Sequence, residues 1–145
     1  MNESFYEEGF FLQTFGSDIL NVLIGLVIII SVLIIGYFVF SRLTRFDDRK
    51  EIAGGNTAAG LYMGSKLLGL CIIVAMVSYS SHSWIQMIVW SLIGMAILCL
   101  VYLIFDWITP HFKVCEEIAN GNLAVAQLLR SVIIGVSIVV GTFLM

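Results

Sequence analysis

Two cations, Lys66 and Arg130, have the type and position most suggestive of chemistry. Each lies inside a long apolar run, about 12–15 Å along the helix that such a run predicts. A cation at the centre of a membrane helix costs at least about 2.5–3.5 kcal/mol, so it usually faces a partner or a water-filled cavity. Asp106 is the acidic residue nearest in depth and the candidate partner. The alternatives are a functional ion or solute site, a structural ion pair, or two side chains that extend to the headgroups.

A motif that occurs twice, 66 residues apart, holds the second set of polar residues. Residues 51–60 read EIAGGNTAAG and residues 117–126 read EIANGNLAVA. Each copy opens with a glutamate, Glu51 or Glu117, and each precedes a long apolar run. A helical hairpin that recurs at a fixed spacing is typical of membrane proteins built from internal repeats. We therefore predict that one helical hairpin is present twice in this chain.

The asparagines of the motif stand where a helix should begin. Asn56 and Asn122 each precede an apolar run, and an Asn side chain at that place caps free backbone N–H groups, which stabilises a helix by about 1 kcal/mol. Gly55 and Gly121 supply the permissive backbone for the turn into the helix. The alternative is that two helix N-termini, lying side by side, form a site for an anion or a lipid headgroup.

The sequence contains residue types that are common in active sites, such as histidine and cysteine, but their spacing matches no known catalytic motif. His82 lies in a serine-rich turn with no carboxylate nearby to orient it, and His111 follows a proline. The cysteines Cys71, Cys99 and Cys115 lack CxxC spacing. Motifs of zinc peptidases, serine hydrolases and phosphate-binding loops are absent. The sequence weighs against an enzyme without excluding one, and it predicts no cofactor, no metal site and no nucleic-acid partner.

Helices in a lipid bilayer must position these residues. Of the 145 residues, 60% are hydrophobic and only 12% are charged, whereas about a quarter are charged in soluble domains. Four runs are long enough for a hydrocarbon core, which takes about 20 residues. Because a lipid-facing backbone must satisfy its own hydrogen bonds, each run is expected to be a helix. The fold class is therefore all-α integral membrane, with four spans near residues 19–40, 58–79, 84–105 and 123–145.

The cations predict the orientation of these spans. All seven lie in, or closer to, the two segments that hold the motif, whereas the N-terminal tail and the turn at 78–83 have none. By the positive-inside rule both motif loops are cytoplasmic and both termini face outward. The seven cations are Arg42, Arg45, Arg49, Lys50, Lys66, Lys113 and Arg130.

The repeat and the orientation together predict the domain organisation. Residues 1–18 are expected to form an outward-facing tail, residues 19–79 the first two-helix repeat, and residues 80–145 the second. Two copies separated by an even number of crossings share one orientation, so the hairpins are parallel, with a pseudo-twofold axis along the membrane normal.

Small residues spaced four apart predict where the helices pack. They recur in the second and fourth spans, and such steps let helix backbones approach closely in lipid. The second and fourth spans are therefore expected to form the central contact, and the same steps suit a homo-oligomer equally well. The glycines of these steps are Gly60, Gly64, Gly69, Gly135 and Gly141.

The repeated unit resembles the YjfL-like family of small bacterial inner-membrane proteins, whose shared domain is of unknown function (number 350). The resemblance covers about residues 20–145, and its best match runs from Gly55 to Gly69. The second copy departs from it with Leu123, Val125 and Gln127. The resemblance implies a four-helix protein of the bacterial inner membrane. It also implies a membrane-associated partner of the envelope-stress type, because related genes often adjoin those of membrane-remodelling proteins.

Two functions follow as expectations. The first is a non-enzymatic membrane component or scaffold, in contact with membrane lipids, whose charged cytoplasmic loops dock a cytoplasmic or peripheral partner. The alternative is an oligomeric ion channel or small-solute transporter that uses Lys66 and Arg130, because four helices are too few for a roomy path in one copy.

Overall fold

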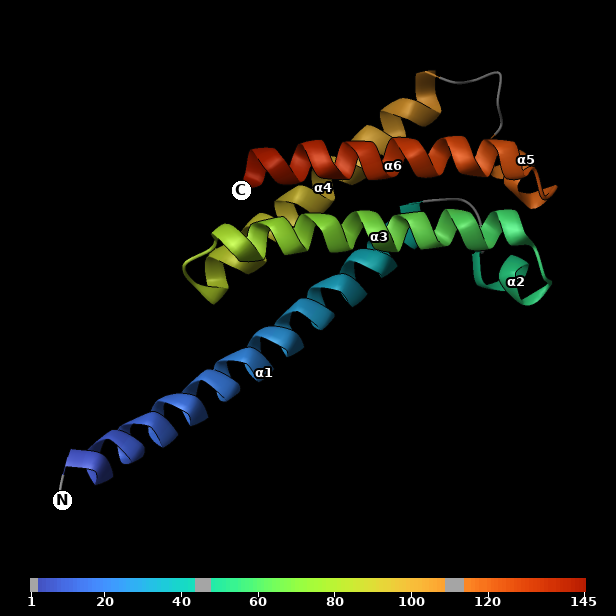
Figure 1. Ribbon diagram of the computed structural model, residues 1–145. Coiled ribbons are helices and arrows are strands. Elements are labelled where there is room, and N and C mark those ends of the chain that lie inside the picture. The colour runs from blue at the N-terminus through green and yellow to red at the C-terminus, as the bar shows by residue number, and fades with distance from the viewer. Residues whose placement is uncertain (1–2, 44–47, 109–113) are drawn as a thin grey trace. The chain divides into compact units, whose positions relative to one another are not determined.

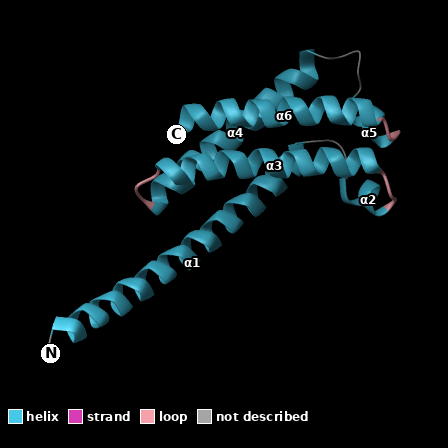
Figure 2. Ribbon diagram, in the orientation of Figure 1, coloured by secondary structure: helices cyan, strands magenta, loops and turns pink. Residues whose placement is uncertain are grey.

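The computed structural model describes residues 3–43, 48–108 and 114–145, and in these ranges the chain is helical without a strand (Figure 2). This confirms the predicted all-α fold class. The helices are α1 (Glu3–Leu43), α2 (Asp48–Ala53), α3 (Thr57–Ser80), α4 (Trp84–Ile108), α5 (Val114–Ala119) and α6 (Leu123–Leu144). Four helices are long, and each of the two short ones, α2 and α5, comes directly before a long one (Figure 1).

The four long helices contain the four predicted spans. Each has an apolar segment long enough to cross a membrane, at Thr14–Arg42, Thr57–Ser80, Trp84–Phe105 and Leu123–Leu144. Many large apolar side chains on these helices are exposed, as expected of surfaces that face lipid rather than water. The first span is longer than predicted, and α1 is continuous, so residues 3–18 belong to the same helix as this span.

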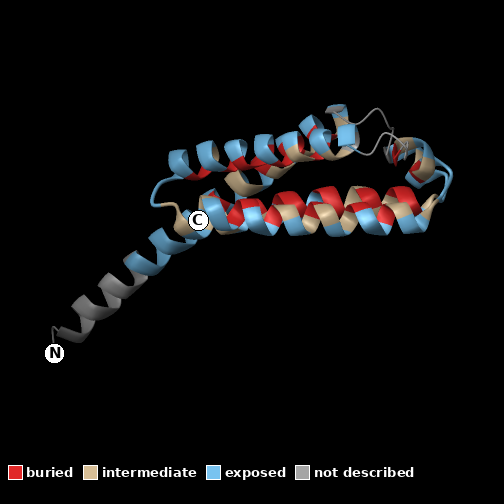
Figure 3. Ribbon diagram, turned by 90° about the horizontal axis from the view of Figure 1, so that it is seen from above, coloured by how far each residue is buried: buried red, intermediate tan, exposed pale blue. Residues whose placement is uncertain are grey.

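The chain divides into two compact units, Met1–Ser31 and Val32–Met145. The predicted organisation into a tail and two two-helix repeats stays a prediction. The first unit is a single helical segment, whose side chains from residue 14 onward are almost all exposed. The second unit holds the end of α1 and all of α2–α6. Its buried residues form stripes along the helices, with exposed residues on the opposite faces (Figure 3).

The central contact of the second unit is between α3 and α6, which lie side by side (Figure 1), as the small-residue pattern predicted. Glycines make this contact close. A Cβ added to Gly69 would lie 2.5 Å from the Ser137 Oγ atom, and one added to Gly141 would collide with Met76. Because Gly69 meets the middle of α6 and Met76 meets its end, the two helices run parallel, and both motif turns lie at the same end of the pair.

The fourth helix and the end of the first pack through similar contacts. A Cβ added to Gly94 of α4 would lie 2.5 Å from Ile73 of α3. One added to Gly36 of α1 would lie 2.9 Å from Met95 of α4. Without a hydrophobic force between helices in lipid, such close backbone approach is a principal source of stability.

Three of the predicted packing glycines are not in helix contacts. A Cβ added to Gly60, Gly64 or Gly135 would meet no atom of another element within 4 Å among the described residues. For Gly60 and Gly64 the reason is rotational, because the GxxxG step of α3 lies on a different side of the helix from Gly69, which faces α6. The role of these three glycines in helix packing, within the chain or between copies, stays a prediction.

Candidate functional site: a polar pocket between the two motif turns

The two motif turns have the same backbone geometry. In the first, the Gly55 N–H donates to Ile52 O and the Asn56 N–H donates to Glu51 O. This pair of bonds ends a helix in the Schellman motif, and it needs the left-handed backbone of Gly55, whose φ is +85°. The turn at 117–122 repeats both bonds, with Gly121 at φ +79°. Each turn thus ends a short helix and begins a long one.

The motif asparagines cap the long helices, as predicted. The Asn56 Oδ1 atom accepts from the N–H groups of Ala58 and Ala59 at 3.0 and 3.2 Å. Asn122 caps α6 in the same way, through the two corresponding N–H groups. These are the donors that an anion at a helix start would use. The caps therefore oppose the alternative of an anion site built from the two helix N-termini.

The motif glutamates hold the amide end of each cap. The Asn56 Nδ2 atom donates to the Glu51 Oε2 atom at 3.2 Å, and the Asn122 Nδ2 atom donates to the Glu117 Oε2 atom at 2.8 Å. The predicted candidates Glu51, Glu117, Asn56 and Asn122 are thus brought together as two local pairs. In each pair the carboxylate accepts from the amide nitrogen, so the amide oxygen is turned toward the free N–H groups at the start of the helix.

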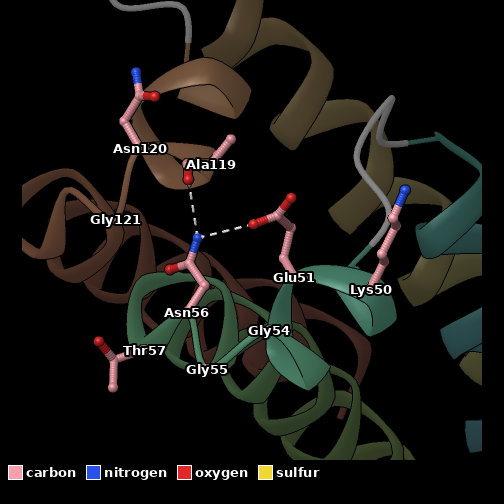
Figure 4. A pocket seen from close by; sticks show the side chains of 9 residues that line it. All are labelled: Lys50, Glu51, Gly54, Gly55, Asn56, Thr57, Ala119, Asn120 and Gly121. Carbon is pink, nitrogen blue, oxygen red and sulfur yellow. Dashed lines mark hydrogen bonds between the residues drawn. The ribbon is translucent and has the colours of Figure 1, made fainter.

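One hydrogen-bond set joins the two turns. The Asn56 Nδ2 atom also donates to the main-chain oxygens of Ile118 at 2.9 Å and Ala119 at 3.1 Å, both at the end of α5. Figure 4 shows the amide between Glu51 and Ala119. The Ile118 oxygen also accepts from the Gly121 N–H within its own turn. The Ala119 oxygen has no such bond among the described residues, so the Asn56 amide satisfies a helix-end carbonyl that would otherwise need water. Segments 62 residues apart in the chain are thereby tied into one surface.

An open pocket of about 510 Å³ lies over this junction. Several of its wall residues have little or no side chain, so much of the lining is backbone. The polar side chains that line it are those of Lys50, Glu51, Asn56, Thr57 and Asn120 (Figure 4). The full lining is Lys50, Glu51, Gly54, Gly55, Asn56, Thr57, Ala119, Asn120 and Gly121.

The short helix α2 also contacts the end of α1. The Arg49 guanidinium carbon lies 5.7 Å from the ring centroids of both Tyr37 and Phe38. The Arg49 Nε atom donates to the Tyr37 hydroxyl at 3.4 Å. Contacts of a guanidinium with aromatic faces are worth about 0.5–1 kcal/mol at exposed sites. They hold α2 beside the first span, with Lys50 exposed next to the pocket.

Lys66 lies in a separate, enclosed site among aromatic rings. Its side chain is only 1% exposed. The Lys66 Nζ atom is 3.8 Å from the ring centroid of Tyr62 and 5.7 Å from that of Phe40. Tyr102 completes the cluster, with its ring 5.4 Å from Phe40 and 6.3 Å from Tyr62. The rings come from α1, α3 and α4, and their π faces stabilise a charge that lipid would not.

Sequence reasoning identified Lys66 but missed these rings. The spacing of Tyr62 and Lys66, four apart on one helix, was the available signal, because such residues are neighbours on a helix surface. Phe40 and Tyr102 carry no comparable local signal. The alternative that Lys66 and Arg130 extend to the headgroups stays a prediction.

The structure does not bring Arg130 together with Lys66. Arg130 is half-buried on α6 and makes no hydrogen bond or ion pair with Lys66 in the described part of the chain. The side chain of Asp106 lies outside the described residues, so its pairing with a cation stays a prediction. The polar groups that the structure does bring together are those of the pocket.

Comparison with known proteins places the chain among membrane proteins of unknown function. The family model described as Domain of Unknown Function (DUF350) matches residues 13–144. The UPF0719 transmembrane protein YshE of Bacillus subtilis is 35% identical over 102 residues, which are 70% of this chain and 76% of that protein. A UPF0719 transmembrane protein of Aquifex aeolicus is 27% identical over 137 residues, and the match spans 90% of this chain but only half of that relative. No solved structure matches.

Proposed function

This chain belongs to the DUF350 family of the preceding comparison, and we propose that it is a non-enzymatic membrane component that docks a cytoplasmic or peripheral protein. The docking surface is formed by the two motif turns with α2 and α5. Its proposed position is the cytoplasmic side of a bacterial inner membrane, with both termini outward, because the cations lie on this side.

The observation that carries this proposal is the bridge from Asn56 to Ile118 and Ala119. A surface that recognises a partner must be held in one shape, since ordering it on binding costs affinity. The bridge holds two turns from distant parts of the chain in one shape. Beside it, Arg49 and Lys50 are exposed on α2, and exposed basic side chains attract an acidic partner surface and speed its association.

The experiment is recovery of partners with the tagged full-length protein, cross-linked in native membranes. Replacing Lys50 by Gln should reduce recovery of a specific partner about tenfold, since a charge-assisted contact is worth about 1.5 kcal/mol. His82→Ala is the control, because His82 is exposed in the turn between α3 and α4, at the far end of those helices. A partner set that is indifferent to Lys50→Gln would contradict the proposal.

The alternative, an oligomeric channel or transporter, has one observation in its favour. Lys66 is a cation wholly buried inside an apolar span, and such residues often mark ion or substrate paths. The rings of Tyr62 and Phe40 around its ammonium weigh against it, because an enclosed cation does not line a wet path in this conformation. Flux through liposomes that is lost in both Lys66→Met and Arg130→Met would favour the channel.

A further inference from the structure

Arg130 is a cation inside a candidate span, and no group in the described part of the chain balances its charge. It lies on the span Leu123–Leu144, about 10 Å along the helix from Leu123. Its side chain is half-buried and makes no hydrogen bond, ion pair or ring contact with any described residue. We propose that Arg130, together with Gln127, binds the phosphate of an anionic phospholipid in the leaflet on the motif-turn side. This site is independent of the docked protein partner, and either proposal can fail alone.

The other cation inside a span shows how this chain stabilises such a charge internally. Lys66 is 1% exposed, and its Nζ atom lies 3.8 Å from the ring centroid of Tyr62 and 5.7 Å from that of Phe40. A charge at membrane depth is costly, so it faces a partner or a water-filled cavity. Because no described ring or carboxylate contacts Arg130, its counter-charge comes from outside the described part of the chain.

A carboxylate from a second copy is the less favoured source of that counter-charge. Of the chain's acidic residues only Asp18 lies in one of the four candidate spans. Asp18 stands near the start of the first span, whereas the end that adjoins a motif turn is at Arg42. The spans therefore hold no carboxylate at the depth of Arg130. Lipid phosphates, by contrast, surround every span directly outside the hydrocarbon core.

Helix geometry directs the Arg130 side chain toward those phosphates. Side chains on a helix point back toward its N-terminus and lie over the preceding turn. On α6 this direction leads from Arg130 toward the motif-turn end of the span. The guanidinium thus comes about 5 Å, one helical turn, nearer to the headgroups than its Cα atom. A long cationic side chain can extend over the remaining distance while its stem stays in apolar surroundings.

Gln127 lies on the same face of α6, because residues three apart are neighbours on a helix surface. It is exposed within the span, and its side-chain amide makes no hydrogen bond with any described residue. The guanidinium of Arg130 presents two parallel N–H donors that match two phosphate oxygens, and the Gln127 amide adds a further donor.

The charge at this site favours an anionic lipid over a zwitterionic one. Arg130 carries a single positive charge, which the phosphodiester of phosphatidylglycerol neutralises. The ammonium group of an ethanolamine or choline headgroup would bring a second cation to the same place, where it is repelled. Basic sites beside membrane helices are known to hold anionic headgroups for this reason.

The test is native mass spectrometry of the purified full-length protein with phosphatidylglycerol, phosphatidylethanolamine and phosphatidylcholine of identical acyl chains. We expect phosphatidylglycerol to bind about tenfold more weakly to Arg130→Gln than to the unchanged protein, since a charge-assisted hydrogen bond is lost. Gln127→Leu should weaken binding about threefold, through loss of a neutral hydrogen bond. Arg130→Lys should bind with intermediate affinity, because it keeps the charge but not the paired donors.

Arg42→Gln is the matched control, because Arg42 is an exposed cation at the motif-turn end of the first candidate span. An equal loss in Arg42→Gln would show general attraction of anionic lipid and overturn the site. Equal binding of the three lipids would overturn it as well, as would an Arg130→Lys variant no better than Arg130→Gln.

Two further results would assign Arg130 to another ligand and overturn the proposal. If soluble glycerol 3-phosphate binds as tightly as the lipid, the site takes a free anion. If Arg130→Gln instead breaks a dimer to which no phosphatidylglycerol is bound, the counter-charge is a carboxylate of a second copy. Because the guanidinium contacts no described residue, thermal unfolding of Arg130→Gln in lipid-free detergent should match that of the unchanged protein.

Discussion

Asn56 and Asn122 cap two helices in the same way, yet only the Asn56 amide also reaches the opposite turn. It donates to Glu51 and to the main-chain oxygens of Ile118 and Ala119. Within the described part of the chain the Asn122 amide donates to Glu117 alone. Two residues at equivalent places in the motif therefore differ in one respect, the link between the turns.

This difference makes the two asparagines a matched pair. Each change to Ala should cost about 1 kcal/mol of helix capping. Asn56→Ala should cost about 0.5–1.5 kcal/mol more, because the Ala119 carbonyl at the end of α5 loses its donor. In Asn56→Ala, amide hydrogen exchange in the opposite turn (residues 117–122) should become faster. In Asn122→Ala, exchange in its opposite turn (residues 51–56) should change much less. Equal effects of the two changes on the opposite turn would show that the bridge does not hold the turns together.

Gly69 and Gly135 form a second matched pair, because they occupy equivalent places in α3 and α6. A Cβ added to Gly69 would lie 2.5 Å from the Ser137 Oγ atom, whereas one added to Gly135 meets no atom of another element within 4 Å. Gly69→Ala should therefore destabilise the protein by about 1–3 kcal/mol. Gly135→Ala should be neutral or stabilising by up to about 1 kcal/mol, from helix propensity. Unfolding of the purified variants in the same lipid particles checks this order.

The aromatic cluster around Lys66 predicts a cost for losing one ring. Tyr62→Leu removes the ring whose centroid is 3.8 Å from the Lys66 Nζ atom. We expect a loss of about 2 kcal/mol or more, since a cation over an aromatic face is worth about that much when desolvated. Tyr79→Leu is the control because Tyr79 is 86% exposed. If thermal unfolding of the two variants is indistinguishable, the rings do not stabilise the buried charge.

The proposed orientation is testable with single cysteines in a variant whose three natural cysteines are replaced by alanine. A membrane-impermeant thiol reagent should label Ser83→Cys in intact cells and should label Asn120→Cys only after the membrane is opened. Both positions are exposed, Ser83 in the turn between α3 and α4, Asn120 in the second motif turn. The reverse pattern would place the motif turns and the docking surface on the outer side.

Much of the fold follows from the sequence because the signals are local. A span needs about 20 apolar residues in a row, and the four such runs coincide with the four candidate spans. The caps at Asn56 and Asn122 and the left-handed glycines Gly55 and Gly121 depend on residues within one turn of themselves. Such features need no knowledge of where the rest of the chain lies.

The tertiary structure alone decided which distant residues meet. The Asn56 amide reaches carbonyls 62 residues away, and Phe40 and Tyr102 approach Lys66 from other helices. Which glycines contact a neighbouring helix was also decided by the tertiary structure. Their spacing predicts a face of small residues, but not the helix rotation that turns this face toward a neighbour. Helix rotation is set by packing between helices. The sequence of one helix does not determine this rotation, so the pocket and the buried cation site form only when the helices pack together.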